Sequence, residues 1–78
     1  MKLSSTQKEM LRGIPTKEVE FPSDHIKIRA FKVGDGQYML HKQGPDAIGM
    51  TTNFITRESV DINQIFNYNH PAYEEIEY

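Results

Sequence analysis

The most constraining feature of the sequence is a β-hairpin pattern over residues 26–42. From Ile26 to Ala30, apolar side chains alternate with basic ones, which is typical of a strand with one buried face. A Gly-Asp-Gly turn at residues 34–36 supplies the positive φ angles that tight hairpin turns require. The apolar phase reverses at Phe31. This indicates either a β-bulge between residues 30 and 31 or a strand end covered on both faces, and we favour the bulge.

Two local patterns precede the hairpin. Ser4 and Gln7 fit a capping box, and apolar residues follow at helical spacing, so we predict a helix over residues 5–12. After Lys17, residues 18–21 alternate acidic and apolar side chains. We therefore predict a strand over residues 17–21 whose valine and phenylalanine face the core and whose two glutamates face solvent.

The local signals after the hairpin are weaker. Residues 48–55 contain threonine and apolar side chains and predict one further strand, with Met50 and Phe54 partly buried. Gly49 within this stretch either weakens the strand or marks a bulge.

A second helix start lies at Asp61. Asp61 and Gln64 form a capping-box pattern, and Val60 with Ile65 fits a hydrophobic staple. We therefore predict a short helix over residues 62–68.

The charge distribution sets the end of the chain apart. Residues 1–60 hold nine basic and seven acidic residues, a net charge of +2, whereas residues 61–78 hold four acidic residues and no basic one. Short acidic ends commonly keep proteins in solution, and this interpretation competes with a dedicated binding tail. Pro71 is able to open a last helical turn, and a flexible end is equally compatible with the sequence.

The predicted fold class is α+β. A small antiparallel sheet of three or four strands carries a short N-terminal helix and a short C-terminal helix. We expect one α+β domain over residues 1–68, followed by an acidic, tyrosine-containing and flexible C-terminal segment over residues 69–78. The chain of 78 residues has a thin core and no cysteine, so we expect a reducing compartment and a cytoplasmic protein. No stretch resembles a signal peptide or a membrane span, and we expect no membrane association.

The sequence offers no recognisable catalytic or metal-binding motif. His25, His41 and His70 lack the spacing of a metal site, and no cysteine accompanies them. The paired glutamates lie in surface-like contexts without the burial that raises the pKa of a general acid. We therefore expect a non-enzymatic protein that binds no metal and no cofactor. Its small size and its asparagine, isoleucine and tyrosine content suggest an accessory protein of a bacterium or bacteriophage.

The leading hypothesis is a small protein-interaction module, an accessory or inhibitor protein of a larger protein partner. A small sheet exposes edges that accept a partner strand. Amphipathic aromatic residues are favoured interface anchors, so the C-terminal segment is a further candidate surface, for a partner or for a second copy in a homodimer. For Tyr73 and Ile76, packing against the edge of the core is an equally good interpretation. The candidate residues are Tyr68, Tyr73, Glu74, Glu75, Ile76 and Tyr78.

The alternative hypothesis is a nucleic-acid-binding protein that uses the basic face of the 26–42 hairpin. Basic side chains neutralise phosphates, and an aromatic ring stacks on a base. The net charge of −2 and the isoelectric point of about 5.8 argue against it, because dedicated nucleic-acid binders are usually strongly basic. The candidate residues are Lys27, Arg29, Lys32, Tyr38, His41 and Lys42.

Overall fold

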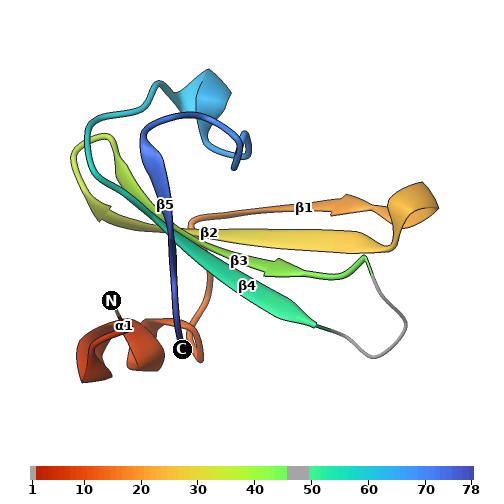
Figure 1. Cartoon of the computed structure of the whole chain (residues 1–78), viewed down its shortest axis with the longest axis horizontal. Helices are drawn as coiled ribbons and strands as arrows, with labels where there is room; N and C mark the ends of the chain where they lie inside the picture. Colours follow the sequence, from red (N-terminus) through yellow and green to blue (C-terminus); the bar gives the residue numbers. More distant parts are fainter. Residues whose placement is uncertain (1, 46–49) are drawn as a thin grey trace.

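Within the computed structural model, which describes residues 2–45 and 50–78, five strands form a single antiparallel sheet. Their order in space is their order in the chain (Figure 1). The helix α1 (Ser5–Met10) precedes them, and 3₁₀ turns lie at η1 (Pro22–Asp24) and η2 (Ile62–Gln64). The strands are β1 (Lys17–Phe21), β2 (Ile26–Gly34), β3 (Gln37–Gln43), β4 (Thr51–Thr56) and β5 (Tyr73–Ile76).

The N-terminal helix begins at the predicted capping box. The Ser4 hydroxyl oxygen accepts from the backbone N–H of Gln7 at 3.2 Å, and the Ser4 N–H donates to Gln7 Oε1 at 2.8 Å. The helix ends at Met10 rather than at residue 12. The reason is that the N–H groups of Arg12 and Gly13 donate to carbonyls three residues back, which is a 3₁₀ pattern.

The predicted hairpin is confirmed, but the predicted bulge position is wrong. β2 and β3 pair through Ala30 and Phe31 without interruption, and the register shifts between Lys32 and Gly34 instead. Gly36 in the turn has a φ of 66°, the left-handed conformation that the sequence pattern requires.

The phase reversal at Phe31 arises because the sheet is covered on both faces. α1 lies on one face, and the segment 57–72 between β4 and β5 lies on the other (Figure 1). Ala30 and Phe31 point to opposite faces, yet they are only 0% and 3% exposed. The helix-side core contains Leu3, Leu11, Phe31, Met39 and Ile76. The loop-side core contains Ile28, Ala30, Tyr38, Leu40, Val60, Ile65 and Ala72.

The strands outside the hairpin follow the predictions in part. β1 has the predicted bounds, but Phe21 at its end is 41% exposed, so its predicted burial is wrong. β4 begins at Thr51, and residues 48 and 49 of the predicted strand lie outside the described residues. Phe54 is partly buried as predicted, whereas Met50 is 60% exposed.

The predicted helix over residues 62–68 is wrong. Asp61 caps only the 3₁₀ turn η2, where its side chain accepts from the N–H of Asn63 at 3.3 Å. A further turn follows, in which the N–H of Asn67 donates to the carbonyl three residues back at 3.0 Å. The two residues of the predicted staple are nevertheless both buried in the loop-side core.

A fifth strand forms where a last helical turn or a flexible end was predicted. β5 pairs antiparallel with β4, and Ile76 lies opposite Asn53. The next residue, Glu77, bridges to Lys2 in parallel, so the two ends of the chain lie side by side near α1 (Figure 1).

The expected α+β class, with two helices on three or four strands, is therefore wrong. The described residues form mainly an antiparallel sheet of five strands, with one short helix and 3₁₀ turns. Residues 62–76 have apolar positions at helical spacing, but tertiary contacts direct them into turns and a strand. The predicted boundary between residues 68 and 69 stays a prediction.

Candidate functional site: the outer edge of β1

The C-terminal segment predicted to bind a partner is largely used within the fold. Ile76 is 4% exposed and belongs to the helix-side core. The Tyr73 hydroxyl donates to the carbonyl of Ile65, and the Tyr68 ring stacks on Phe54 with the ring centroids 5.6 Å apart. Tyr73 and Tyr68 hold the 57–72 segment on the loop side of the sheet, and Ile76 packs in the core on the opposite face.

Of the three remaining C-terminal candidates, Glu74 is paired, whereas Glu75 and Tyr78 are exposed. The Glu74 carboxylate pairs with the Arg57 guanidinium at 2.7 Å, and this hydrogen-bonded contact lowers the pKa of the Glu74 carboxyl and raises the pKa of Arg57. Glu75 is exposed, and Tyr78 is 60% exposed with the Lys8 ammonium 4.9 Å from its ring centroid. Of the six C-terminal candidates, Glu75 and Tyr78 therefore offer the most surface to a partner.

Burial raises the pKa of the Tyr73 hydroxyl to about 12, and the neighbouring Tyr38 adds to the shift. An unfolded chain ionises a tyrosine near pH 10. Because the folded state keeps this proton at higher pH than the unfolded state, the corresponding stability is complete below about pH 10. It is lost as the pH rises toward about 12.

Tyr73→Phe removes both the ionisation and the hydrogen bond to Ile65. At neutral pH we expect the variant to lose about 1 kcal/mol of unfolding free energy, the usual contribution of one hydrogen bond. Near pH 11 the difference from the wild type should shrink, because only the wild type loses stability through this hydroxyl. Urea unfolding at both pH values measures the gap, and an equal gap at both would contradict the assignment.

The residues predicted for nucleic-acid binding do not share one surface. By strand alternation and register they divide into a helix-side set of Lys27, Arg29 and His41 and a loop-side set of Lys32, Tyr38 and Lys42. Tyr38 is 8% exposed in the loop-side core, so its ring has little surface on which a base could stack. The Lys42 ammonium lies 4.7 Å from the centroid of the Tyr68 ring, and His41 Nδ1 lies 2.8 Å from Asn53 Oδ1.

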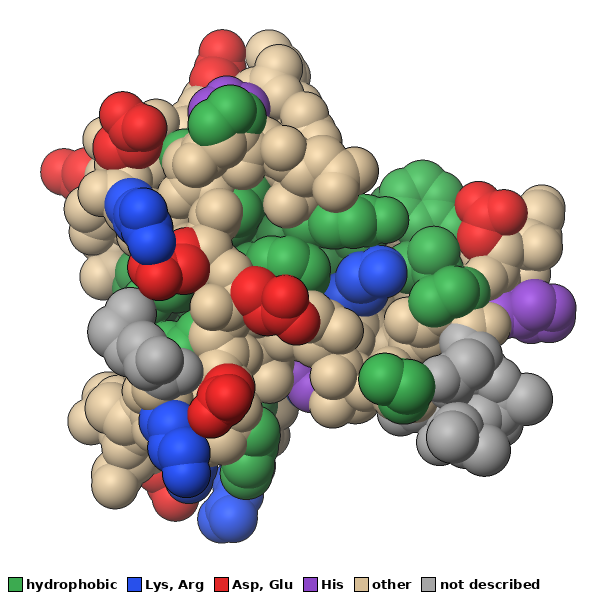
Figure 2. All heavy atoms as spheres, viewed as in Figure 1, with side chains coloured by type: hydrophobic (Ala, Val, Ile, Leu, Met, Phe, Trp, Pro, Cys, Tyr) green, Lys and Arg blue, Asp and Glu red, His purple; other side chains and the backbone are tan. Residues whose placement is uncertain are grey.

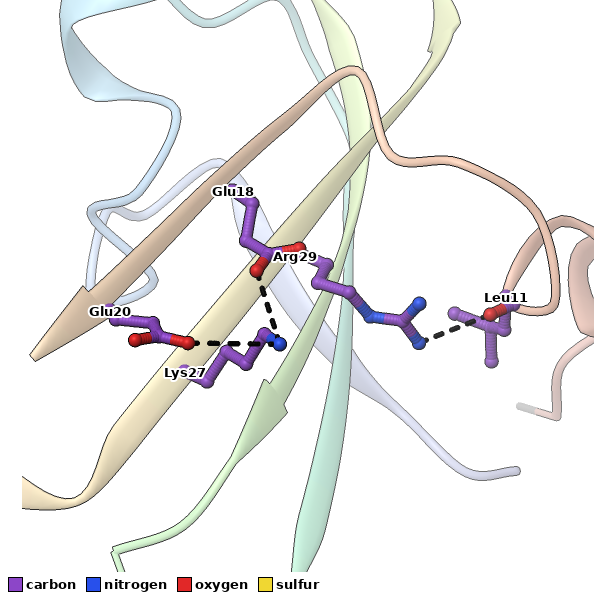
Figure 3. Close-up of polar contacts among 5 residues, drawn as sticks. All are labelled: Leu11, Glu18, Glu20, Lys27 and Arg29. Atoms are coloured by element: carbon purple, nitrogen blue, oxygen red, sulfur yellow. Dashed lines mark hydrogen bonds and ion pairs between the residues drawn. The ribbon is translucent and has the colours of Figure 1, made fainter.

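The two strongest bases of the helix-side set contact groups of the protein itself (Figure 3). The Lys27 ammonium lies between two carboxylates, 3.1 Å from Glu18 and 3.7 Å from Glu20. The Arg29 guanidinium donates to the carbonyl of Leu11 at 3.1 Å and so ties β2 to the end of α1. Nucleic-acid binding stays a prediction, and this arrangement gives it little support.

Sequence patterns predicted the strand 17–21 but not its place in the sheet. β1 is the outermost strand and pairs through one side with β2. No strand within residues 2–45 and 50–78 pairs with its other side, and four of its five residues are exposed. Every second residue of an edge strand turns its N–H and C=O groups outward, where they are able to bind an added strand. We call residues 17–21 with this open side the β1 edge.

The β1 edge presents different chemistry on its two faces. On the loop side the strand begins at Lys17, Val19 lies opposite the buried Ile28, and Phe21 ends it at 41% exposure. On the helix side Glu18 and Glu20 keep 38% and 61% of their side-chain surface exposed. Both carboxylates contact the single Lys27 ammonium, whereas Arg29, which lies opposite Glu18, donates to the carbonyl of Leu11 instead.

The apolar face of the β1 edge continues across the end of the sheet. Phe21 pairs with Ile26, which packs partly against the loop-side core, and Met50 is also exposed. Figure 2 shows hydrophobic side chains that extend from the centre of the molecule toward the end of the sheet where β1 turns into β2. Apolar surface rimmed by charged groups often marks a protein contact.

A second surface feature lies beside β5. The pairing of β4 with β5 ends at Asn53, and an open hollow of about 530 Å³ follows next to Thr51 and Thr52. Its lining includes Glu75 and Tyr78, the two exposed C-terminal candidates. This hollow is therefore the part of the structure that best fits the predicted C-terminal contact.

No three histidine, cysteine, aspartate or glutamate side chains of the described residues gather in a group that would hold a metal ion. No helix in the same part of the chain is long and apolar enough to cross a membrane. No protein family, curated protein or solved structure matches the chain. Function is therefore inferred from the surface alone.

Proposed function

We propose that the protein is a small protein-binding module, an accessory protein or inhibitor that accepts an extended segment of a larger partner at the β1 edge. The observation that carries the proposal is an open edge strand with Val19 and Phe21 on one face, after Lys17 at its start, and with two glutamates on the other face. In strand addition, main-chain hydrogen bonds supply affinity and the alternating side chains supply specificity.

The other end of the sheet is a weaker candidate. Beyond β5 the N–H of Leu3 donates to the carbonyl of Glu77 at 2.8 Å, so the N-terminal residues already occupy part of that edge. The side chains of Tyr73 and Ile76 are engaged in the two cores. A partner strand would meet more unoccupied backbone at β1 than at β5.

The charges of the β1 edge fit a surface that stays open until its partner arrives. Exposed edge strands pair indiscriminately when they are flat and hydrophobic, and charged side chains suppress that pairing. Three of the five residues of β1 are charged: Lys17, Glu18 and Glu20. The edge therefore discourages random self-association while it leaves the backbone accessible.

A pair of photo-crosslinking variants tests the location of the contact. Phe21 and Tyr78 are exposed aromatic residues at opposite edges of the sheet, so the added benzoyl group of benzoylphenylalanine has open space at either position. After irradiation in the native organism, we expect the Phe21 variant to form a covalent adduct with one partner protein. Mass spectrometry should locate the adduct in an extended segment of that partner.

The Tyr78 variant is the matched control. Adducts formed only from position 78 would assign the contact to the hollow beside β5 and contradict the proposal. Absence of adducts from both positions would contradict it as well. Adducts of the Phe21 variant with a second copy of this chain would replace the larger partner by a homodimer.

A further inference from the structure

We infer that the segment bound at the β1 edge alternates apolar and basic residues, with the apolar side chains on the loop side and the basic ones on the helix side. This inference rests on the proposed function and names the chemistry of the partner. It follows from the side chains that a strand added beside β1 would meet.

Side chains of neighbouring strands interact in pairs on the same face of the sheet. A residue opposite Val19 or Phe21 would lie over apolar surface, where a charged group would lose solvation without a partner. A residue opposite Glu18 or Glu20 would lie within reach of an exposed carboxylate. An added strand therefore gains from apolar and basic side chains in alternation.

The inner neighbour of β1 already has this composition. Over residues 26–30, β2 alternates Ile, Lys, Ile, Arg and Ala. Ile28 lies opposite Val19, and Lys27 lies opposite Glu20 with its ammonium 3.7 Å from that carboxylate. A partner of the same pattern would repeat on the open side the contacts that β2 makes on the paired side (Figure 3).

A second copy of this chain is a poor occupant of the same edge. Two copies of β1 would pair antiparallel, with Val19 and Phe21 of both copies on the same side of the sheet. Whenever three or more residues of each strand overlap, two glutamates then lie directly opposite each other: Glu18 and Glu18, Glu18 and Glu20, or Glu20 and Glu20. Like charges directly opposite one another destabilise a sheet. Registers shifted by one residue would set at least one glutamate against Val19 or Phe21 and would turn the two apolar faces to opposite sides of the sheet. The charge pattern thus favours a different, basic chain.

The test uses synthetic octapeptides with blocked ends. The probe alternates valine and lysine, and two control peptides alternate valine with glutamine and valine with glutamate. Chemical shifts of the isotope-labelled full-length protein are followed during each titration. We expect shift changes at residues 17–21 with the lysine peptide, weaker changes with the glutamine peptide, and none with the glutamate peptide.

Charge removal at the edge gives a matched pair of variants. We expect Glu18→Gln with Glu20→Gln to weaken binding of the lysine peptide by about five- to twentyfold, because the variant removes two opposite-charge pairs between β1 and the added strand. The control is Asp35→Asn with Glu58→Gln, which removes the same charge from exposed positions outside β1 and should leave binding unchanged. Thermal unfolding checks that both variants fold.

Backbone methylation of the probe separates strand addition from adhesion by charge alone. The N–H groups of an extended peptide point alternately to its two sides, so only one of two alternating N-methylation patterns blocks the side that faces β1. We expect one pattern to abolish binding and the other to retain it. Equal binding of both methylated peptides would contradict strand addition.

The outcomes separate the inference from the proposed function. Shift changes at residues 17–21 that are equal for all three peptides, and insensitive to Glu18→Gln with Glu20→Gln, would overturn the basic partner and leave the β1 edge as the contact. Absence of shift changes at β1 with every peptide would overturn both. Selective loss in the Asp35 and Glu58 control would place the contact away from β1 and overturn both.

Discussion

Phe31→Ala is expected to lower the free energy of unfolding by about 3–5 kcal/mol, the usual cost of emptying a buried phenylalanine site. Phe31 is 3% exposed and belongs to the helix-side core with Leu3 and Leu11, the residues that flank α1. No residue of α1 itself is buried, so the helix is held to the sheet mainly through these flanking contacts. Small domains are stable by only about 5–15 kcal/mol, so this loss is a large share of the total.

Removal of the Phe31 side chain should also release α1 from the sheet. A helix of six residues is far too short to persist in water without tertiary contacts. Removal of the Phe31 ring also removes the surface near which the Arg29 guanidinium lies, 5.3 Å from the ring centroid. We therefore expect the amide protons of residues 7–11 to exchange faster with solvent in the variant, even below the urea concentrations that unfold the sheet.

Phe21→Ala is the matched control for this prediction. It deletes the same side chain at a position that is 41% exposed, so the expected cost is below about 1.5 kcal/mol. Urea unfolding, followed by circular dichroism, compares the two variants under one condition. Equal losses would mean that the helix-side core does not depend on Phe31. The same Phe21 variant should weaken binding of the valine–lysine peptide, because it removes apolar surface from the β1 edge.

The correct predictions all depend on residues close together in the chain. Ser4 and Gln7 signal α1, and the glycine turn at residues 34–36 signals the β2–β3 hairpin. The strand 17–21 follows from alternation with a wet face, since β1 lies at the edge and its glutamates remain exposed. In each case the local signal and the tertiary structure agree, which is the condition under which sequence patterns are reliable.

Two of the errors, at Phe31 and at residues 73–76, share one physical origin, which is the coverage of the sheet on both faces. Ala30 and Phe31 are neighbours, and both are buried because each face has its own cover. Tyr73 and Ile76 likewise point to opposite faces of β5, and their separation of three residues imitates a helix. Where both faces of a strand are buried, period two no longer appears in the hydrophobic pattern.

The prediction of a helix after residue 60 is wrong for a related reason. Asp61 has the sequence of a helix cap, yet the chain contains several asparagines that favour turns over helix interiors. The carbonyl of Ile65 accepts from the Tyr73 hydroxyl, a contact across eight residues that no local pattern reports.

The candidate site was predicted in its chemistry but not in its position. Sequence patterns indicate an exposed sheet edge as a contact surface, and they give the alternation of Glu18, Val19 and Glu20. They do not tell which strands are outermost, because strand order depends on contacts between distant parts of the chain. They also led us to combine Lys27 and Lys42 into one basic surface, although the register places these residues on opposite faces.

Gly44→Ala is the second substitution for which we expect a large effect, a loss of about 2–4 kcal/mol of unfolding free energy. Gly44 has a φ of 98°, a conformation that residues with a Cβ atom rarely adopt. A Cβ atom at this position would lie 2.0 Å from the carbonyl oxygen of His25. Because that oxygen belongs to the backbone at the start of β2, the clash is relieved only if β2 or β3 moves.

Gly13→Ala is the control that separates this steric effect from the lower conformational entropy that any glycine-to-alanine substitution gives the unfolded chain. The nearest atom to a Cβ at Gly13 is the Met10 carbonyl oxygen at 3.4 Å, an ordinary contact. We expect this control to change stability by less than about 1 kcal/mol, with either sign. If both substitutions cost the same in urea unfolding, the close approach of residues 25 and 44 does not limit stability. If only Gly44→Ala is costly, the end of the sheet that supports Phe21 and Ile26 is rigid, which favours a preformed β1 edge.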